Sequence, residues 1–345
     1  MRRSAFLGGF IGLFTACTTV NYVGIETYNP AEITFPEEVA KILIVNNAVP
    51  QPADAGYTFT LFGQKQDTCQ VKADSALFDA CESLGKAIAD ADYFNDVLLY
   101  NGATRTDNQP LEDRKMSKAE VVALCEANGA DAIVSIDRLL FDMKKDVWMM
   151  SGSYVVGLID VKTAGVVRCY LPGREVPLAT VHVADSITWA ESADNQEMLD
   201  LFLPDAENAL RATGEYIGAK VYTNFVPHWV NESRWYFTGL GAAWKEASAF
   251  AAAEKWDQAA ERWQSLYDSS GGWKGKARAA SNLALCREME GKMSEAYEWA
   301  SKSYELFLKN SGEDKKYTQL LKLYVDVLAE RLRNDKKLNI QFGVE

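Results

Sequence analysis

Two stretches near the carboxyl end of the chain carry the same order of large and small side chains, and this repetition limits the possible folds more than any other feature. In both, a large residue is followed three positions later by alanine and seven positions later by another helix-face residue, with a glycine before the second stretch: Trp256, Ala259 and Trp263, then Gly291, Met293, Ala296 and Ala300. Met293 lies 37 positions after Trp256 (293 − 256). Offsets of three and four place side chains on one face of a helix. The pattern therefore predicts two equivalent helical units in tandem.

This pattern resembles the second helix of the tetratricopeptide repeat, whose period is about 34 residues, with three extra positions here in the loop 269–272. Segments 239–253 and 277–290 precede the two stretches and are expected to be the first helices of the two pairs. The resemblance implies stacked helix pairs in which alanines allow close approach and the large side chains serve as packing. Segment 316–333 has an apolar stripe at helical spacing and is expected to cap the second pair.

The region before the repeats has the sequence pattern of a sheet domain. Short apolar runs predict buried strands, and apolar residues at helical spacing predict helices between them. One helix has a capping box, because Ser117 is followed three residues later by Glu120, and it is expected to stop at Gly129. The expected order is strand, helix, strand, helix, strand, at residues 41–45, 75–91, 96–100, 117–128 and 131–136.

Beyond these elements we expect an antiparallel hairpin, a further strand and a long helix. The hairpin strands are 155–160 and 166–170 with a turn at 162–165, and the helix spans 195–225. The fold class is then an α/β (or α+β) amino-terminal sheet domain followed by an all-α tetratricopeptide-like domain. The expected divisions are a signal peptide, a tether, the sheet domain, the helical domain and a tail, at 1–16, 17–37, 38–233, 234–338 and 339–345.

Three segments of the sheet domain give it a topological resemblance to the extracytoplasmic domains of curli-secretion and TolB amino-terminal type. They are Lys41–Val45, Ala127–Ile136 and Leu158–Val167, although Ala164 stands between the Thr and Gly that are adjacent in those families. The resemblance implies an accessory component of a secretion or envelope assembly. A long amphipathic hairpin would mark such a component, and the sequence does not indicate a hairpin of that length.

The amino terminus has the order of a secretory signal peptide. Arg2 and Arg3 precede an apolar run at 5–14, which is followed by Ala16 and Cys17. A run of ten residues spans about 15 Å as a helix, which is half of the bilayer's apolar thickness. The small residue before Cys17 resembles a lipobox, from which Phe14 departs, and the resemblance implies lipid on Cys17. We expect a cell-envelope lipoprotein, periplasmic or surface-exposed at the outer membrane; the alternative is an ordinary secretory signal.

Charge and residue spacing argue against several kinds of site. The formal net charge is −12 with Lys and Arg interspersed among Asp and Glu, so nucleic-acid binding is not expected. The five remaining cysteines match no zinc-ligand spacing, and their disulfide state is left open: Cys69, Cys81, Cys125, Cys169 and Cys286. His182 and His228 are interpreted as structural, and neither a metal nor a cofactor is expected.

No motif in the sequence indicates catalysis. The glycines at 271–277 lack one spacing residue and the Ser or Thr of a phosphate loop, and those at 239–244 lack the third glycine of a dinucleotide site. The neighbouring acids Glu112 and Asp113 are interpreted as solvated positions without a role.

We therefore expect a non-enzymatic envelope lipoprotein that binds or scaffolds a protein or peptide partner through its repeat module. It resembles uncharacterised tetratricopeptide-containing lipoproteins of gut Bacteroidota. The alternative is a surface lipoprotein that binds or hydrolyses carbohydrate, with catalytic carboxylates brought together only by the fold.

Overall fold

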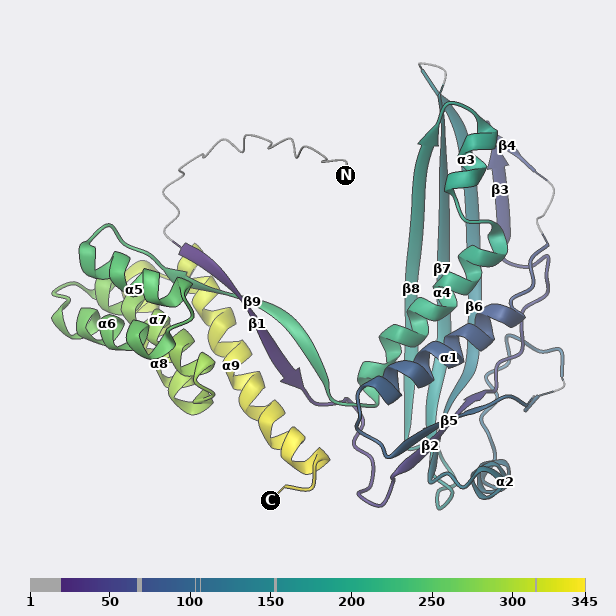
Figure 1. Cartoon of the computed structure of the whole chain (residues 1–345), viewed down its shortest axis with the longest axis horizontal. Helices are drawn as coiled ribbons and strands as arrows, with labels where there is room; N and C mark the ends of the chain where they lie inside the picture. The colour runs from purple at the N-terminus through teal and green to yellow at the C-terminus, as the bar shows by residue number, and fades with distance from the viewer. Residues whose placement is uncertain are drawn as a thin grey trace, which may run out of the picture. The chain divides into compact units, whose positions relative to one another are not determined.

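Figure 1 shows a computed structural model of the chain, which describes residues 20–66, 70–102, 104–105, 107–151, 154–313 and 315–344. The described residues form two compact units. The helical unit contains Val20–Asn29 and Trp229–Leu338, and the sheet unit contains Pro30–His228 and 339–344. The predicted signal peptide, Cys17 and Cys69 lie outside the described residues.

The sheet unit is built on one mixed, seven-stranded sheet. Its strands are β2 (Lys41–Asn46), β3 (Tyr57–Leu61), β4 (Gln64–Lys65), β5 (Asp96–Tyr100), β6 (Ala132–Met150), β7 (Tyr154–Tyr170) and β8 (Ala179–Ala193). β2 pairs in parallel with β5 and β6, and β3 pairs in parallel with β6. The long strands β6, β7 and β8 are antiparallel and run side by side in Figure 1.

β6 is long enough to have two different neighbours on one edge. Its first part, 132–136, pairs with β2, and its later part, 143–147, pairs with β3. The opposite edge of β6 pairs with β7 along nearly its whole length. This leaves a short stretch of β6, between β2 and β3, without a strand partner on that edge.

Helices cover both faces of the first part of the sheet. The helices are α1 (Asp74–Asp90), α2 (Lys118–Asn128), α3 (Gln196–Phe202) and α4 (Ala206–Val221), with a 3₁₀ turn at Tyr222–Asn224. Alternate residues of β2 face opposite sides: Ile42 and Ile44 lie in the core with α1 and α4, and Leu43 and Val45 lie in the core with α2. β2 is therefore buried on both faces, as its continuous apolar sequence predicts.

α1 and α4 cross one face of the long strands in Figure 1, and glycines bring the two helices together. A Cβ on Gly214 would overlap the carbonyl oxygen of Ala76, and a Cβ on Gly218 would overlap that of Ala80. The approach of the two helices thus requires glycine at both positions.

The capping box is confirmed, whereas two other local predictions are wrong. Ser117 Oγ accepts from Glu120 N, and Gly129 is left-handed at φ 63°. Residues 155–170 are one continuous strand, β7, so the hairpin predicted within them is absent. β7 instead forms a long antiparallel hairpin with β6, of a length that the sequence did not indicate. The predicted helix 195–225 is two helices, because Pro204 interrupts it and Asp205 caps the second.

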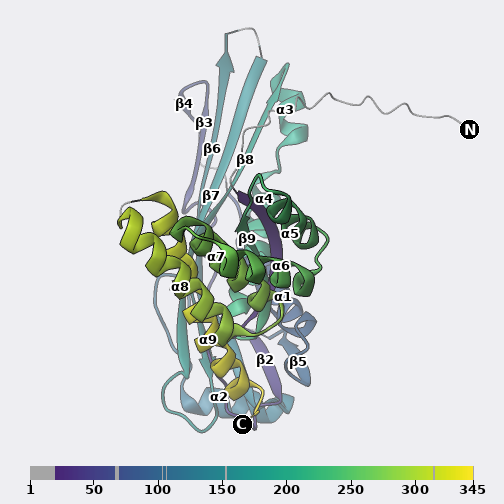
Figure 2. The same cartoon turned by 90° about the vertical axis from the view of Figure 1, so that its left-hand side faces the viewer.

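The region after β9 (His228–Phe237) confirms the expected class of an all-α module after a sheet domain. Its helices are α5 (Ala242–Ala252), α6 (Trp256–Ser269), α7 (Trp273–Met289), α8 (Met293–Ser311) and α9 (Lys316–Gln341). Figure 2 turns these helices toward the viewer. No helix in the described part of the chain is long and apolar enough to cross a membrane.

The helical unit also holds two strands, β1 (Val20–Asn29) and β9 (His228–Phe237), which pair with each other. Thr27 Oγ1 donates to Val230 O, and Asn21 Nδ2 donates to the Tyr236 hydroxyl. These two contacts place the strands in opposite directions.

The structure therefore differs from the predicted tether and tail. Within 17–37, the described residues from Val20 onward form β1 and a segment that buries Ala31 and Phe35, so they are not a free spacer. In the predicted tail 339–345, Gln341 Nε2 donates to Ala31 O at 2.9 Å and Tyr93 donates to Gln341 O at 2.8 Å. Packing of this kind is long-range, and residue spacing does not reveal it.

Candidate functional site

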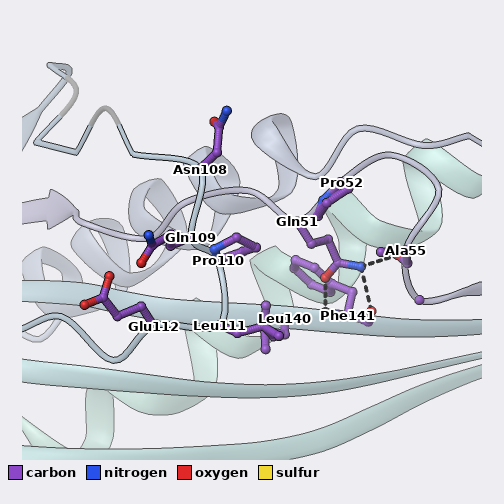
Figure 3. Close-up of a pocket in the computed structure, with 11 residues that line it drawn as sticks. Gln51, Pro52, Ala55, Asn108, Gln109, Pro110, Leu111, Glu112, Leu140 and Phe141 are labelled. Carbon is purple, nitrogen blue, oxygen red and sulfur yellow. Dashed lines mark hydrogen bonds between the residues drawn. The ribbon is translucent and has the colours of Figure 1, made fainter.

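A cavity of about 600 Å³ in the sheet unit lies beside the carboxyl end of β2. Two loop segments, 47–56 and 107–117, enclose it against one stretch of β6. Figure 3 shows most of its lining, which consists of small or apolar residues, three amides and one carboxylate: Gln51, Pro52, Ala55, Gly56, Asn108, Gln109, Pro110, Leu111, Glu112, Leu140 and Phe141. We call this the loop pocket.

One wall of the loop pocket is fixed by the side chain of Gln51. Its Oε1 accepts from Phe141 N at 2.7 Å, and its Nε2 donates to Phe141 O at 2.9 Å and to Ala55 O at 2.6 Å (Figure 3). Phe141 lies in the part of β6 that has neither β2 nor β3 beside it. The buried amide of Gln51 therefore takes the place of a strand neighbour and satisfies both backbone groups of Phe141.

Gly56 permits this arrangement. It has φ +80°, and a Cβ at this position would overlap Phe141 O and lie 2.8 Å from Gln51 Nε2. Its own carbonyl accepts from Met143 N at 2.7 Å. Because only glycine combines this backbone angle with this closeness, Gly56 fixes the position of the 47–56 loop.

The opposite wall is held by Arg105, which is buried although it is charged. Its guanidinium forms a two-point pair with Asp107 at 2.7 and 2.9 Å and donates to Gln109 O at 3.1 Å. The hydrogen bond from Arg105 lowers the pKa of Asp107. The loop that presents Asn108 and Pro110 is thus held in shape without a ligand.

A buried ionic cluster fastens the same loop to the sheet. Asp137 is fully buried and accepts from Arg168 at 2.8 Å, Ser135 at 2.7 Å, Asn47 at 3.1 Å and the Tyr170 hydroxyl. Four donors around one carboxylate compensate for its removal from water. The charge of Asp137 therefore has a structural explanation.

Arg168 extends this cluster to Asp113 of the loop, through two contacts of 2.7 Å. Burial would lower the pKa of Arg168, but its bonds to Asp113 and Asp137 raise it overall. The hydrogen bond from Arg168 lowers the pKa of Asp113. Asp113 thus has a structural role that the sequence did not indicate, and its neighbour Glu112 lines the loop pocket.

The end of the sheet unit at the β6–β7 turn exposes large apolar side chains. In Figure 1 the adjoining ends of β6 and β7, α3 and the β3–β4 turn lie at the same end of the unit. Phe62 N donates to Val147 O, which brings the β3–β4 turn beside β6. The exposed residues, which we call the apolar end, are Phe62, Trp148, Met149, Met150, Tyr154, Met198, Leu201 and Phe202.

α3 is amphipathic, and its packing explains why part of it is exposed. Leu199 and Leu203 are buried, and a Cβ on Gly157 of β7 would lie 2.8 Å from Leu199 and 2.6 Å from Leu203. Leu201 and Phe202 point away from this contact and are 82% and 55% exposed. Such exposure of adjacent large apolar residues is uncommon unless the surface is covered in use.

In the helical unit, the strand β9 is held by α7. Asn282 Nδ2 donates to Phe237 O at 2.8 Å, and Phe237 N donates to Asn282 Oδ1 at 2.7 Å. The Phe237 ring is fully buried against Phe307 and Tyr317, with ring centroids 5.9 and 5.2 Å apart. The face of α7 that carries Asn282 therefore already binds an extended segment, which is β9 of the same chain.

A buried acid joins β9 to two helices. Glu288 of α7 accepts from Arg234 of β9 at 3.0 Å and from the Tyr324 hydroxyl of α9 at 2.7 Å. Arg331 of α9 pairs with the same carboxylate. Burial, followed by the charge of Glu288, raises the pKa of Tyr324 well above its ordinary value.

The residues of the repeat pattern lie in helix cores. Ala259, Trp263, Ala296 and Ala300 are fully buried, Met293 is buried, and Trp256 is partly buried against the same core as Trp263. Gly291 takes φ +74° in the turn before α8. These side chains pack helices together, as expected for the large residues of the pattern.

The remaining sequence candidates form no metal site in the described residues. His182 is exposed on β8, and His228 Nδ1 is 3.2 Å from Val226 O. No group of three or more His, Cys, Asp or Glu side chains in the described ranges could hold a metal ion. Four cysteines are free and buried thiols: Cys81, Cys125, Cys169 and Cys286.

Comparison with known families places both parts of the chain. The family described as "Domain of unknown function (DUF8603)" matches residues 39–237, and "Domain of unknown function (DUF6340)" matches residues 245–330. No match is found among curated proteins. Since the first match covers more than half of the chain, the protein belongs to the DUF8603 family.

Proposed function

We propose that the protein is a non-enzymatic lipoprotein of the bacterial cell envelope, anchored by lipid on Cys17, which binds a protein partner through the apolar end of its sheet unit. The observation that carries the proposal is the exposure of eight large apolar side chains at this end. They come from three separate parts of the chain: the β3–β4 turn, the adjoining ends of β6 and β7, and α3. Met149 lies on the sheet face that carries α3, and Trp148, Met150 and Tyr154 lie on the other face, so apolar side chains surround this end of the unit. Exposed apolar residues gathered at one end are typical of protein interfaces.

The helical module is a weaker candidate for this role than the sequence indicates. The face of α7 that carries Asn282 already holds Phe237 of the same chain, and Glu288 already pairs with Arg234. A partner at that face would have to displace a fully buried phenylalanine. We therefore propose that the module acts as a scaffold for β9 and β1.

Acidic side chains border the apolar end and indicate the character of the partner. Glu191 and Asp194 lie at the end of β8, and Glu197 is exposed on α3. Asp200 is paired with Lys145 at 2.9 Å. We propose that the partner presents an apolar patch with Lys or Arg around it, because such charges complement this border.

Photo-cross-linking in the native cells tests the binding surface. A photoreactive residue at Met149 or Leu201 should give a specific adduct of defined mass, and the same residue at Leu323, which is 61% exposed on α9, should not. Equal adducts at all three positions would remove the apolar end from the proposal. The intact mass of the mature protein, beside that of a Cys17→Ala variant, tests the lipid anchor separately.

Carbohydrate binding is the second candidate, and the loop pocket is the feature that favours it. Asn108, Gln109 and Glu112 line this cavity and could hydrogen-bond to hydroxyl groups. Titration calorimetry with soluble envelope glycans should show heat that is lost in an Asn108→Leu/Gln109→Leu variant. Absence of heat with the wild-type protein would reject this candidate.

A further inference from the structure

β8 is the edge strand of the long antiparallel part of the sheet, and its free edge is unusually long. It spans 15 residues, Ala179–Ala193, and pairs with β7 along its length. No other described strand pairs with β8. A strand of this length presents an edge of roughly 50 Å at about 3.3 Å per residue.

The hydrogen-bonding pattern shows which residues of β8 face the free edge. Phe141 of β6 directs its N–H and C=O to Gln51, away from β7. Opposite residues of an antiparallel pair point both groups toward or away from each other. Thr163, opposite Phe141, therefore points toward β8, and Asp185, opposite Thr163, points back toward β7.

Ser186 and the other even-numbered residues from 180 to 192 therefore direct their N–H and C=O groups outward. One contact supports this assignment: Ser186 N donates to Asp185 Oδ1 at 2.8 Å, in the absence of a strand partner. The remaining outward groups are available for pairing with an extended chain.

The sequence of β8 lacks most of the devices that protect an edge strand. Between 179 and 193 there is no proline, no glycine and no lysine, and the strand is rich in Val, Ile, Thr and Trp. Natural edges are usually short, bulged or interrupted by Lys or Pro. The strand has two acidic residues, Glu191 near its end and Asp185 in its middle, and the central Asp185 needs explanation.

We propose that β8 pairs in antiparallel fashion with β8 of a second copy of this chain, with the two-fold axis at Ser186. Ser186 is the central residue of the strand, so this register pairs all 15 residues, with Ala179 opposite Ala193. An axis at any other residue shortens the overlap. A partner strand of equal length and twist is provided by the chain itself.

The charges of the strand fit this register. Asp185 lies opposite Ile187, Glu191 opposite Val181, and His182 opposite Ala190, so no two like charges face each other. An axis at Asp185 would instead place two carboxylates directly opposite, which is destabilising.

The negative charge of Asp185 is also compensated within each copy. Lys220 of α4 pairs with Asp185, and the Tyr216 hydroxyl donates to it at 3.0 Å. Pairing requires Ser186 N to exchange its bond with Asp185 for a bond to the second copy. Asp185 then keeps its two partners on α4.

Cysteine cross-linking of the full mature chain, with Cys17→Ser to exclude lipid, tests the register directly. Opposite residues of a hydrogen-bonded pair have Cα atoms about 5.5 Å apart, within disulfide range. Ser186→Cys should therefore give a covalent dimer on mild oxidation. His182→Cys alone should not, because two copies of residue 182 would be roughly 26 Å apart.

A mixture of the His182→Cys and Ala190→Cys chains should give the heterodimer, because these positions are opposite. The Cys17→Ser chain with no introduced cysteine is the control, because it shows whether the native thiols alone form a covalent dimer. Cross-linking of His182→Cys to itself as readily as Ser186→Cys would overturn the register.

Sedimentation velocity provides the second measurement. The Cys17→Ser chain should sediment as a dimer that dissociates on dilution, and Ala184→Pro should halve the mass, since proline removes an outward N–H that the monomer does not use. Its unfolding temperature should stay close to that of the parent when both are measured at a concentration low enough for the parent to be monomeric. A parent chain that remains monomeric at every concentration, together with no Ser186→Cys dimer, would overturn the proposal; it does not depend on the apolar end.

Discussion

The side chain of Asn282 hydrogen-bonds to both backbone groups of Phe237: its amide nitrogen donates to the carbonyl oxygen, and its amide oxygen accepts from the N–H. In the other unit, the side chain of Gln51 makes the same two hydrogen bonds to the backbone of Phe141. In each case a strand residue lacks a neighbouring strand on one side, and a side-chain amide supplies both missing hydrogen bonds. Both units thus use a side-chain amide to satisfy strand backbone groups that no neighbouring strand binds.

Replacement of Asn282 by alanine should destabilise the helical unit. Both backbone groups of Phe237 would remain buried without partners, and each such group costs about 1–3 kcal/mol. We expect a loss of about 2–4 kcal/mol, measured by urea unfolding followed through tryptophan fluorescence. Asn310→Ala is the matched control, because Asn310 bonds only its own helix at an exposed position. An equal loss in both variants would contradict the clamp.

A comparison of Gly56 with Gly63 separates two costs of a Cβ at Gly56: the strain of a left-handed backbone and the overlap with neighbouring atoms. Gly56 has φ +80° and Gly63 has φ +79°, but a Cβ on Gly63 would meet no atom within 4 Å. Alanine at Gly63 should cost only the backbone strain, about 1–2 kcal/mol. Alanine at Gly56 should cost clearly more, because it also displaces Gln51. Thermal unfolding of the two variants tests this, and equal unfolding temperatures would reject it.

Much of the fold follows from local sequence patterns. The strand 41–45, the helix from Ser117 to Gly129 and the repeated helices at Trp256 and Met293 were predictable because each depends on residues close in the chain. The long strand β7 was not, because Lys162 and Gly165 have the composition of a turn. Pairing with strands on both sides determines their conformation instead.

The candidate sites were less predictable, since they depend on contacts between distant residues. Gln51 lies 90 positions from Phe141, and Asp113 lies 55 positions from Arg168. Nothing in the residues around Gln51 distinguishes it from an exposed glutamine. The large apolar residues Trp148, Met149 and Met150 are adjacent in the sequence, but the sequence does not reveal that they are exposed at the end of a long strand.

Acid should weaken the attachment of the 107–117 loop through Asp113. Its pKa is lowered in the folded protein, so the pair with Arg168 contributes stability above the unfolded-state pKa of about 3.9 and loses it as the pH falls through the folded-state pKa. Asp113→Asn should be less stable than wild type near neutral pH, and the difference should shrink below about pH 4. Unfolding temperatures measured across this range provide the test. Asp335→Asn, an exposed change of the same charge, controls for net charge.

The buried thiols should resist alkylation in the folded protein. Burial raises the pKa of Cys81 to about 12, and burial followed by the charge of Asp131 raises the pKa of Cys125 to about 11. Thiolates are the reactive form, so both should stay unmodified by iodoacetamide at mildly alkaline pH and react after urea unfolding. Peptide mass spectrometry distinguishes the sites. Rapid labelling of either cysteine in native buffer would contradict the burial.

The pair of Glu288 and Arg234 should be strongly coupled, because both groups are buried. Glu288→Ala alone leaves the Arg234 guanidinium without its main counter-charge, and breaking a buried pair in this way costs about 3–5 kcal/mol. Replacement of both residues, as Glu288→Leu with Arg234→Met, should recover part of that loss, since an apolar pair needs no counter-charge, while Arg331 and the Tyr324 hydroxyl still lose their partner. A double-mutant cycle with Glu288→Leu, Arg234→Met and the combined variant measures the coupling. Simple additivity would show that Arg331 and Tyr324, rather than Arg234, account for the stability that Glu288 provides.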